Sequence, residues 1–151
     1  MKVAGEMTSG KTDDEIIPDH PLAEEQQKIK NLKKVFLIIA GTAFQKYGQD
    51  LEKNQQTLMG LSDMMIEIYF AESAILRTIK NINKGVDMRH QIDMTKLYVF
   101  DAIETVNRKS KETIGNIAVG DAQVNLQRSV HRLCRYKNLP NIIELKNRIA
   151  G

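Results

Sequence analysis

The chain has 151 residues, 42% hydrophobic and 27% charged, which is enough for one globular domain and too few for two. This composition excludes a disordered chain, a single cysteine excludes an internal disulfide, and no apolar run approaches the roughly 20 residues of a membrane span. Residues 1–6 lack the apolar stretch of a signal peptide, which predicts a cytoplasmic protein. Residues 1–27 carry two basic and seven acidic side chains, so an acidic arm precedes a basic body.

Residues 1–20 are polar and without periodicity, and we expect a disordered or extended arm or linker. Asp19, His20 and Pro21 then mark the start of a helix over 21–52, because a capping residue and an early proline favour helix initiation. Apolar residues recur there at three- and four-residue steps: Ile29, Leu32, Phe36, Ile39, Ala43 and Tyr47. Gly41 and Gly48 are the weak points of this helix, and Gly41 could allow a close helix approach.

A second helix is predicted over 55–84, ending at Gly85. Its apolar residues cover more than half of its circumference, so we expect it to be the most buried helix and expect losses of about 2–5 kcal/mol for Ile68→Ala or Ile75→Ala. Further helices are predicted over 91–118, 121–137 and 140–149. The fold class is therefore all-α: an antiparallel four-helix-type bundle over 21–151 with a short extra C-terminal helix.

One motif imitates a nucleotide site. Residues 5–12 read G-E-M-T-S-G-K-T and fit the phosphate-binding loop of nucleotide-binding proteins. That loop needs a buried strand before it, and only four residues precede Gly5. The acidic residues 13–15 that follow would repel a nucleotide. We therefore expect this motif, with Lys11, to be inert.

Metal and acid–base chemistry find little support in the pattern. None of the histidines (His20, His90 and His131) has the glutamate three residues earlier that a di-iron bundle uses, so no metal site is predicted. The second helix carries three carboxylates beside its apolar stripe: Asp63, Glu67 and Glu72. They could serve as an acid–base pair, but ion pairs with Arg77 or Arg108 are the commoner use of such residues. No catalytic residue is predicted.

A basic stretch occupies the predicted helix 121–137. Arg128, Arg132 and Arg135 recur at helical spacing opposite an apolar side formed by Leu126, Val130 and Leu133. This is a candidate docking face for anionic lipid or an acidic partner. The alternatives are a solvated face, or ion pairs inside the bundle with carboxylates such as Glu67, Glu72 or Glu104. The stretch is too short, and lacks the motifs, for nucleic acid. Nearby basic residues could lower the pKa of Cys134, but an ordinary buried or half-buried thiol is the expectation.

Residues 61–69 read L-S-D-M-M-I-E-I-Y and are followed at 74–77 by A-I-L-R. Residues 38–43 (I-I-A-G-T-A) and 45–48 (Q-K-Y-G) precede them in the helix before. In this order the segments resemble the second C-terminal helical domain of very-long-chain-type acyl-CoA dehydrogenases. The likeness covers about residues 22–137.

The resemblance implies a part of an oxidoreductase of fatty-acid β-oxidation that uses FAD to desaturate acyl-CoA thioesters. In such enzymes the catalytic glutamate and the flavin site lie upstream of this domain, so neither catalytic nor cofactor-binding residues are carried over to this chain. The domain itself is expected to support dimer architecture or docking, with the rest of the dehydrogenase, a homodimer partner or an anionic membrane surface as its partner. The alternative is a free-standing helical protein-interaction module.

Overall fold

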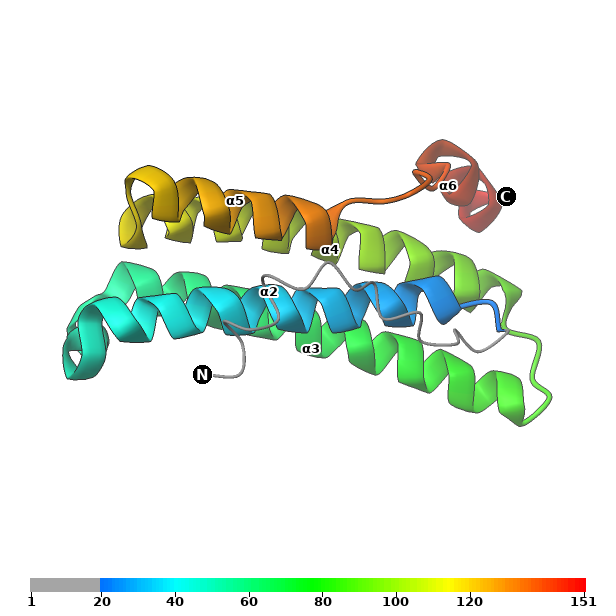
Figure 1. Ribbon diagram of the computed structural model, residues 1–151. Coiled ribbons are helices and arrows are strands. Elements are labelled where there is room, and N and C mark those ends of the chain that lie inside the picture. Colours follow the sequence, from blue (N-terminus) through cyan, green and yellow to red (C-terminus); the bar gives the residue numbers. More distant parts are fainter. Residues whose placement is uncertain (1–19) are drawn as a thin grey trace.

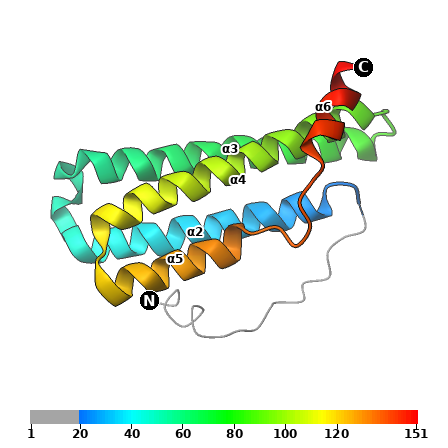
Figure 2. The same cartoon turned by 90° about the horizontal axis from the view of Figure 1, so that it is seen from above.

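Side-by-side helices make up the computed structural model, which describes residues 20–151 (Figure 1). In chain order these are α2 (Ala23–Tyr47), the 3-10 helix η1 (Gly48–Lys53), α3 (Gln55–Asn83), α4 (Arg89–Ile117), α5 (Gly120–Cys134) and α6 (Ile142–Ala150). From α2 to α5 each α-helix runs opposite to the one before it (Figure 2). The predicted all-α, antiparallel bundle with a short extra helix is confirmed over these residues.

The core forms where the apolar stripes of α2, α3, α4 and α5 meet. Each helix contributes side chains at three- and four-residue spacing, which places them on one face. The largest fully buried side chains include Leu32 and Ile39 of α2, Met64 and Ile75 of α3, Ile103 and Ile114 of α4, and Val130 of α5. The 15-residue α5 packs on α2 and α4 and is half as long as α4, so it covers one half of the bundle.

The first helix is shorter than predicted at both ends. It begins at Ala23, and Pro21 lies in the turn before it, where the His20 ring accepts a hydrogen bond from the Leu22 amide at 3.1 Å. It ends at Tyr47, because Gly48 adopts a φ of 54° that a right-handed helix does not allow. The chain then continues as η1, so the prediction of one helix to residue 52 was wrong.

Alanine substitutions at two glycines of this region should change the free energy of unfolding in opposite directions. Gly48→Ala should lower the free energy of unfolding by about 1–2 kcal/mol, because a side chain is strained at positive φ. Gly41→Ala should raise it by up to about 1 kcal/mol, because Gly41 lies inside α2 with open space around its missing Cβ. Urea unfolding followed by circular dichroism measures both. A lower free energy of unfolding for Gly41→Ala would contradict the open space that the structure shows around this glycine.

The second and third long helices lie within two residues of their predicted bounds. Asn54 caps α3 by accepting a hydrogen bond from the Thr57 amide at 3.2 Å, and Gly85 follows the helix at a φ of 81°. The prediction that this helix is the most buried was wrong, however. Its outer side chains, among them Tyr69 at 66% exposure, face away from the core, and α4 has the longer buried face.

The fourth helix ends at Cys134 and not at residue 137. Arg135 is extended, and its carbonyl oxygen accepts a hydrogen bond from Lys28 Nζ at 2.6 Å. The centroid of the Tyr136 ring lies 5.7 Å from that of the Phe100 ring and 4.5 Å from Lys28 Nζ. These contacts from α2 and α4 hold the chain out of the helix.

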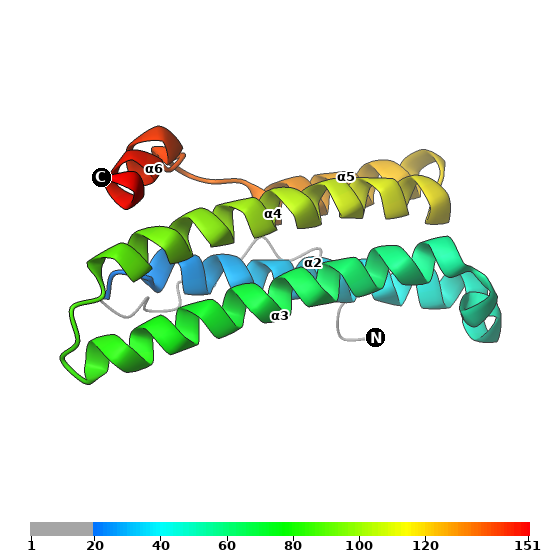
Figure 3. The same cartoon turned by 180° about the vertical axis from the view of Figure 1, so that it is seen from behind.

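At the end of the bundle, α6 packs against α4 (Figure 3). Asn141 caps it by accepting a hydrogen bond from the Glu144 amide at 3.0 Å. Leu145 is buried, and Arg148 binds both oxygens of Asp93 at 2.9 and 3.0 Å. The buried Leu145 and the bidentate Arg148–Asp93 ion pair thus help to attach α6 to the bundle.

Candidate functional surface

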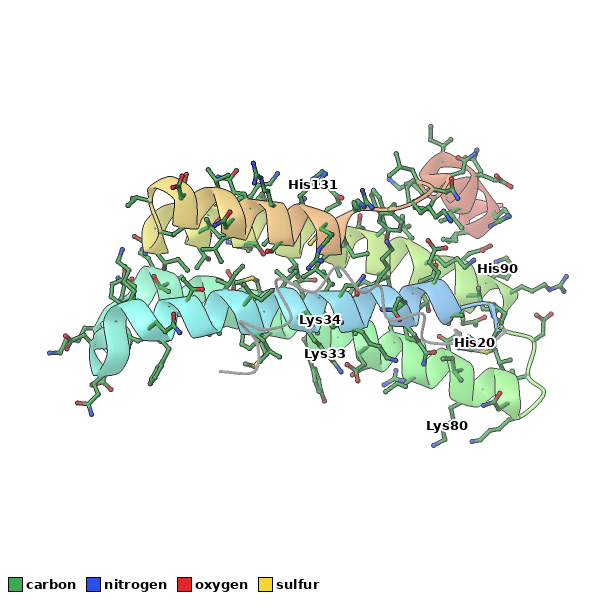
Figure 4. The ribbon with its side chains drawn as sticks, in the orientation of Figure 1. His20, Lys33, Lys34, Lys80, His90 and His131 are labelled. Carbon is green, nitrogen blue, oxygen red and sulfur yellow. The ribbon has the colours of Figure 1, made fainter. Side chains whose placement is uncertain are left out.

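The predicted basic face is divided between a helix and the segment after it. Arg128 and Arg132 lie on α5, but Arg135 lies beyond its end in extended conformation. All three side chains are exposed, and Figure 4 places His131 on the side of α5 away from α2 and α3. The structure therefore brings two of the three arginines together on one helix face and places the third at its end.

None of these arginines forms an ion pair with any residue of 20–151, so pairing with Glu67, Glu72 or Glu104 inside the bundle is wrong. Glu72 instead pairs with Lys33 of α2. The basic face is open to solvent, as both the docking hypothesis and the simple solvated-face alternative require. Whether it binds anionic lipid stays a prediction, which co-sedimentation with anionic vesicles at low and high salt tests.

The exposure of these arginines predicts a small effect on stability. Replacing Arg128, Arg132 and Arg135 together by Gln should change the free energy of unfolding by less than about 0.5 kcal/mol, because no buried contact is lost. Thermal unfolding of the triple variant beside the unmodified chain measures this. A loss of several kcal/mol would show that the arginines support the bundle.

Two of the three carboxylates of α3 form ion pairs with other helices, but their partners differ from those predicted. Asp63 pairs with Lys109 of α4 at 3.3 Å, and Glu72 pairs with Lys33. Arg108 lies 3.9 Å from Glu112 on its own helix. The pairs of Asp63 and Glu72 join neighbouring helices through lysines, and they favour a structural use of these two carboxylates over an acid–base site.

A small groove lies between the start of α3 and the end of α4. It has a volume of about 140 Å³, and Gly60 and Thr113 help to line it. A Cβ on Gly60 would meet Thr113 Oγ1 at 2.6 Å, so the helices approach closely here. Pockets for drug-sized ligands occupy about 300–1,000 Å³, and FAD is a larger molecule than such ligands. The residues that form this groove do not fit a flavin.

Cys134 lies in the core at 5% exposure. Burial raises the pKa of its thiol to about 11, and the Glu104 carboxylate adds to this effect. The suggestion that nearby basic residues lower this pKa was wrong, because desolvation outweighs the opposing effect of Lys28 and Lys111. A thiol that stays protonated at neutral pH is a poor nucleophile.

Within residues 20–151 no three His, Cys, Asp or Glu side chains gather as a metal site would require. The His20 ring is engaged near the start of α2, where Nε2 lies 2.7 Å from Gln26 Oε1. The phosphate-loop motif at 5–12 lies outside the described residues. None of the helices in the described part of the chain is long and apolar enough to cross a membrane.

The sequence interpretation missed an exposed apolar surface on α2 and α3. The Lys33–Glu72 ion pair marks where these helices meet. Leu37 and Phe44 follow Lys33 by 4 and 11 residues, so they lie on the same side of α2. Helical spacing from Glu72 likewise places Met65, Tyr69 and Leu76 on the matching side of α3. We call this surface the α2/α3 apolar face, which continues around α3 and comprises Leu37, Phe44, Met59, Met65, Ile66, Tyr69, Phe70 and Leu76.

Each member of the α2/α3 apolar face is more than half exposed, and the rings of Tyr69 and Phe70 meet edge to face at 5.6 Å. A sequence signal for it existed. An apolar arc wider than half of a helix exceeds what one bundle interface buries, so it indicates a second contact surface.

In sequence and in fold, the chain is similar to acyl-CoA dehydrogenases. Residues 31–132 match the model of the acyl-CoA dehydrogenase C-terminal domain. The chain is 30% identical over 142 residues to a probable acyl-CoA dehydrogenase of Bacillus subtilis, which covers 90% of the chain and 24% of that protein. It is 32% identical to an acyl-CoA dehydrogenase of Bacillus anthracis solved in complex with FAD, with a TM-score of 0.90 over 99% of the chain and 25% of that protein. The chain thus spans about a quarter of the length of these relatives.

Proposed function

Because this chain belongs to the acyl-CoA dehydrogenase family, as its C-terminal domain, we propose that it serves as the architectural and docking domain of an FAD-dependent enzyme that desaturates acyl-CoA thioesters. In this proposal the remaining three quarters of such an enzyme hold the flavin and the catalytic residues. This domain supports their assembly, including a homodimer. The reaction is an oxidation within fatty-acid breakdown, and the location is cytoplasmic.

One observation carries the proposal. Nearly the whole chain superposes on one quarter of a dehydrogenase that was solved with FAD, at a TM-score of 0.90 and 32% identity. A bundle that shared only helical periodicity with the family would not match it in both fold and sequence. The alternative of an unrelated free-standing interaction module is therefore not favoured. The names of the matched proteins carry no acyl-chain length, so the very-long-chain type stays a prediction.

A chimera tests this function directly. The C-terminal quarter of the Bacillus anthracis enzyme is replaced by residues 20–151 of this chain. We expect the chimera to bind FAD, to form the same oligomer as the parent enzyme and to oxidise acyl-CoA. An enzyme that ends before the replaced quarter is the matched control, and we expect it to lose flavin, assembly or both.

Two results would contradict the proposal. A chimera no better than the shortened control would mean that this domain does not support the flavoenzyme. A purified 151-residue chain that retained yellow flavin through gel filtration would mean that the cofactor site lies in the chain itself. A panel of acyl-CoA substrates of increasing length, applied to the active chimera, tests the chain-length class.

A further inference from the structure

Eight of the fifteen exposed large apolar side chains among the described residues lie on the outer sides of α2 and α3. Six of the fifteen lie on α3 and two on α2, where they form the α2/α3 apolar face. The remaining ones are scattered over turns, α6 and the other helices; α5, for example, exposes Val124. Monomeric proteins rarely leave such a group of side chains in water, and groups of this kind mark contact surfaces.

We propose that the α2/α3 apolar face is the surface by which this domain packs against the flavin-binding body of the dehydrogenase, while the basic face of α5 points away from that contact. This inference rests on the proposed function and assigns the contact to particular residues. We assign the flavin-binding body as the partner because the chain spans about a quarter of the length of its relatives. The other three quarters of such an enzyme offer a large folded surface for this contact.

The chemistry of the face fits a protein partner. It combines Met65, Tyr69 and Phe70 with aliphatic side chains, and aromatic residues and methionine are enriched in protein interfaces. Its members are exposed side chains on two helices, from Phe44 of α2 to Leu76 of α3, so it offers an extended surface and not a closed pocket. A partner with a matching apolar surface would bury it.

The charges beside Leu76, at one end of this face, are basic. Glu72 is neutralised by Lys33, while Arg77 and Lys80 have no ion-pair partner among residues 20–151. Figure 4 places Lys80 on the outer side of α3, away from the core. We therefore expect carboxylates on the body around its apolar contact, since complementary charge at a rim favours correct docking.

Oxidative footprinting tests the assignment without altering the chain. The 151-residue chain and the chimera are exposed to hydroxyl radicals, and oxidation is read by mass spectrometry. Met65, Tyr69 and Phe70 should be oxidised at least about fivefold more slowly in the chimera, because oxidation of such side chains follows exposure. His131 on α5 is the internal control and should react equally in both proteins.

A pair of variants adds an energetic test. Met65→Lys with Tyr69→Lys should lower the temperature at which the chimera releases FAD by about 5 °C, a shift typical of losing large interface contacts. The matched control, Val124→Lys with Gln127→Lys on α5, adds the same charge and should change nothing. Neither pair should alter the melting temperature of the 151-residue chain, because these side chains are exposed in it.

The outcomes separate the two proposals. A chimera that fails to bind FAD overturns the proposed function and this inference with it. An active chimera with equal footprints on both faces, or with His131 protected instead, overturns the assignment of the face and leaves the function standing. A 151-residue chain that dimerises, and whose dimer is broken by the Met65 and Tyr69 changes, shows that the occupant is a second copy and overturns it also.

Discussion

We expect Ile75→Ala to lower the free energy of unfolding by about 2–5 kcal/mol, because it removes a large aliphatic side chain from a closely packed core. Ile75 is 1% exposed and lies on the inner side of α3, where this helix meets α2 and α4. Ile68, at 6% exposure on the same side, should behave alike. Urea unfolding of each variant, followed by far-ultraviolet circular dichroism, gives the loss.

The next residue along α3 supplies the matched control. Leu76 is 52% exposed on the α2/α3 apolar face, so Leu76→Ala should cost less than about 1 kcal/mol in the isolated chain. Equal losses at residues 75 and 76 would contradict the orientation of α3 in the bundle. In the chimera the two losses should become similar, since Leu76 would then be buried by the body.

The second large effect concerns the thiol of Cys134. With a pKa of about 11, against an ordinary value of 9.0, it should be alkylated by iodoacetamide at pH 8 about 100-fold more slowly than a free thiol, because the thiolate is the reactive form. Burial slows the reaction further. In urea, where the chain is unfolded, the reaction should become fast. Rapid labelling of the folded chain would mean that α5 opens readily from α2.

The same shift has a sign in stability. A pKa that is raised in the folded state stabilises the protein fully below pH 9 and loses that contribution as the pH rises through about 11. The two-unit difference corresponds to about 3 kcal/mol. The unmodified chain should therefore lose about 2 kcal/mol more than Cys134→Ala between pH 8 and pH 11, measured by urea unfolding at each pH. Parallel curves for the two proteins would contradict a buried neutral thiol.

What could be predicted from the sequence was set by local chemistry. The start of α3 follows from Asn54 and its end from Gly85, since caps of this kind act within a few residues. The ends of α2 and α5 were missed for different reasons. The apolar pattern continues past Gly48 to Leu51, which conceals the break. Arg135 is held out of α5 by Lys28, 107 residues away in the chain, and no local pattern records such a contact.

The candidate surfaces divide in the same way. The exposure of Arg128 and Arg132 was predictable because they lie opposite the apolar stripe of their own helix. The pairing of Glu72 with Lys33 was not, because it depends on how far α2 and α3 are shifted along each other. The α2/α3 apolar face was visible in the sequence as an excess of apolar residues. It was assigned to the core because a pattern gives the width of a stripe and not the number of neighbours that cover it.

Both described ends of the chain lie at the same end of the bundle, and η1 lies at the opposite end (Figures 1 and 2). A helix rises about 1.5 Å per residue, so the 29 residues of α4 span about 43 Å. The bundle is thus a rod whose far tip would swing through about 7 Å for a tilt of 10° at the near end, a lever arm set by this helix length. Phe44 lies towards the far tip and Leu76 towards the near end. A contact along the α2/α3 apolar face would therefore fix the tilt of the bundle relative to the body. An attachment at one end alone would leave this tilt free.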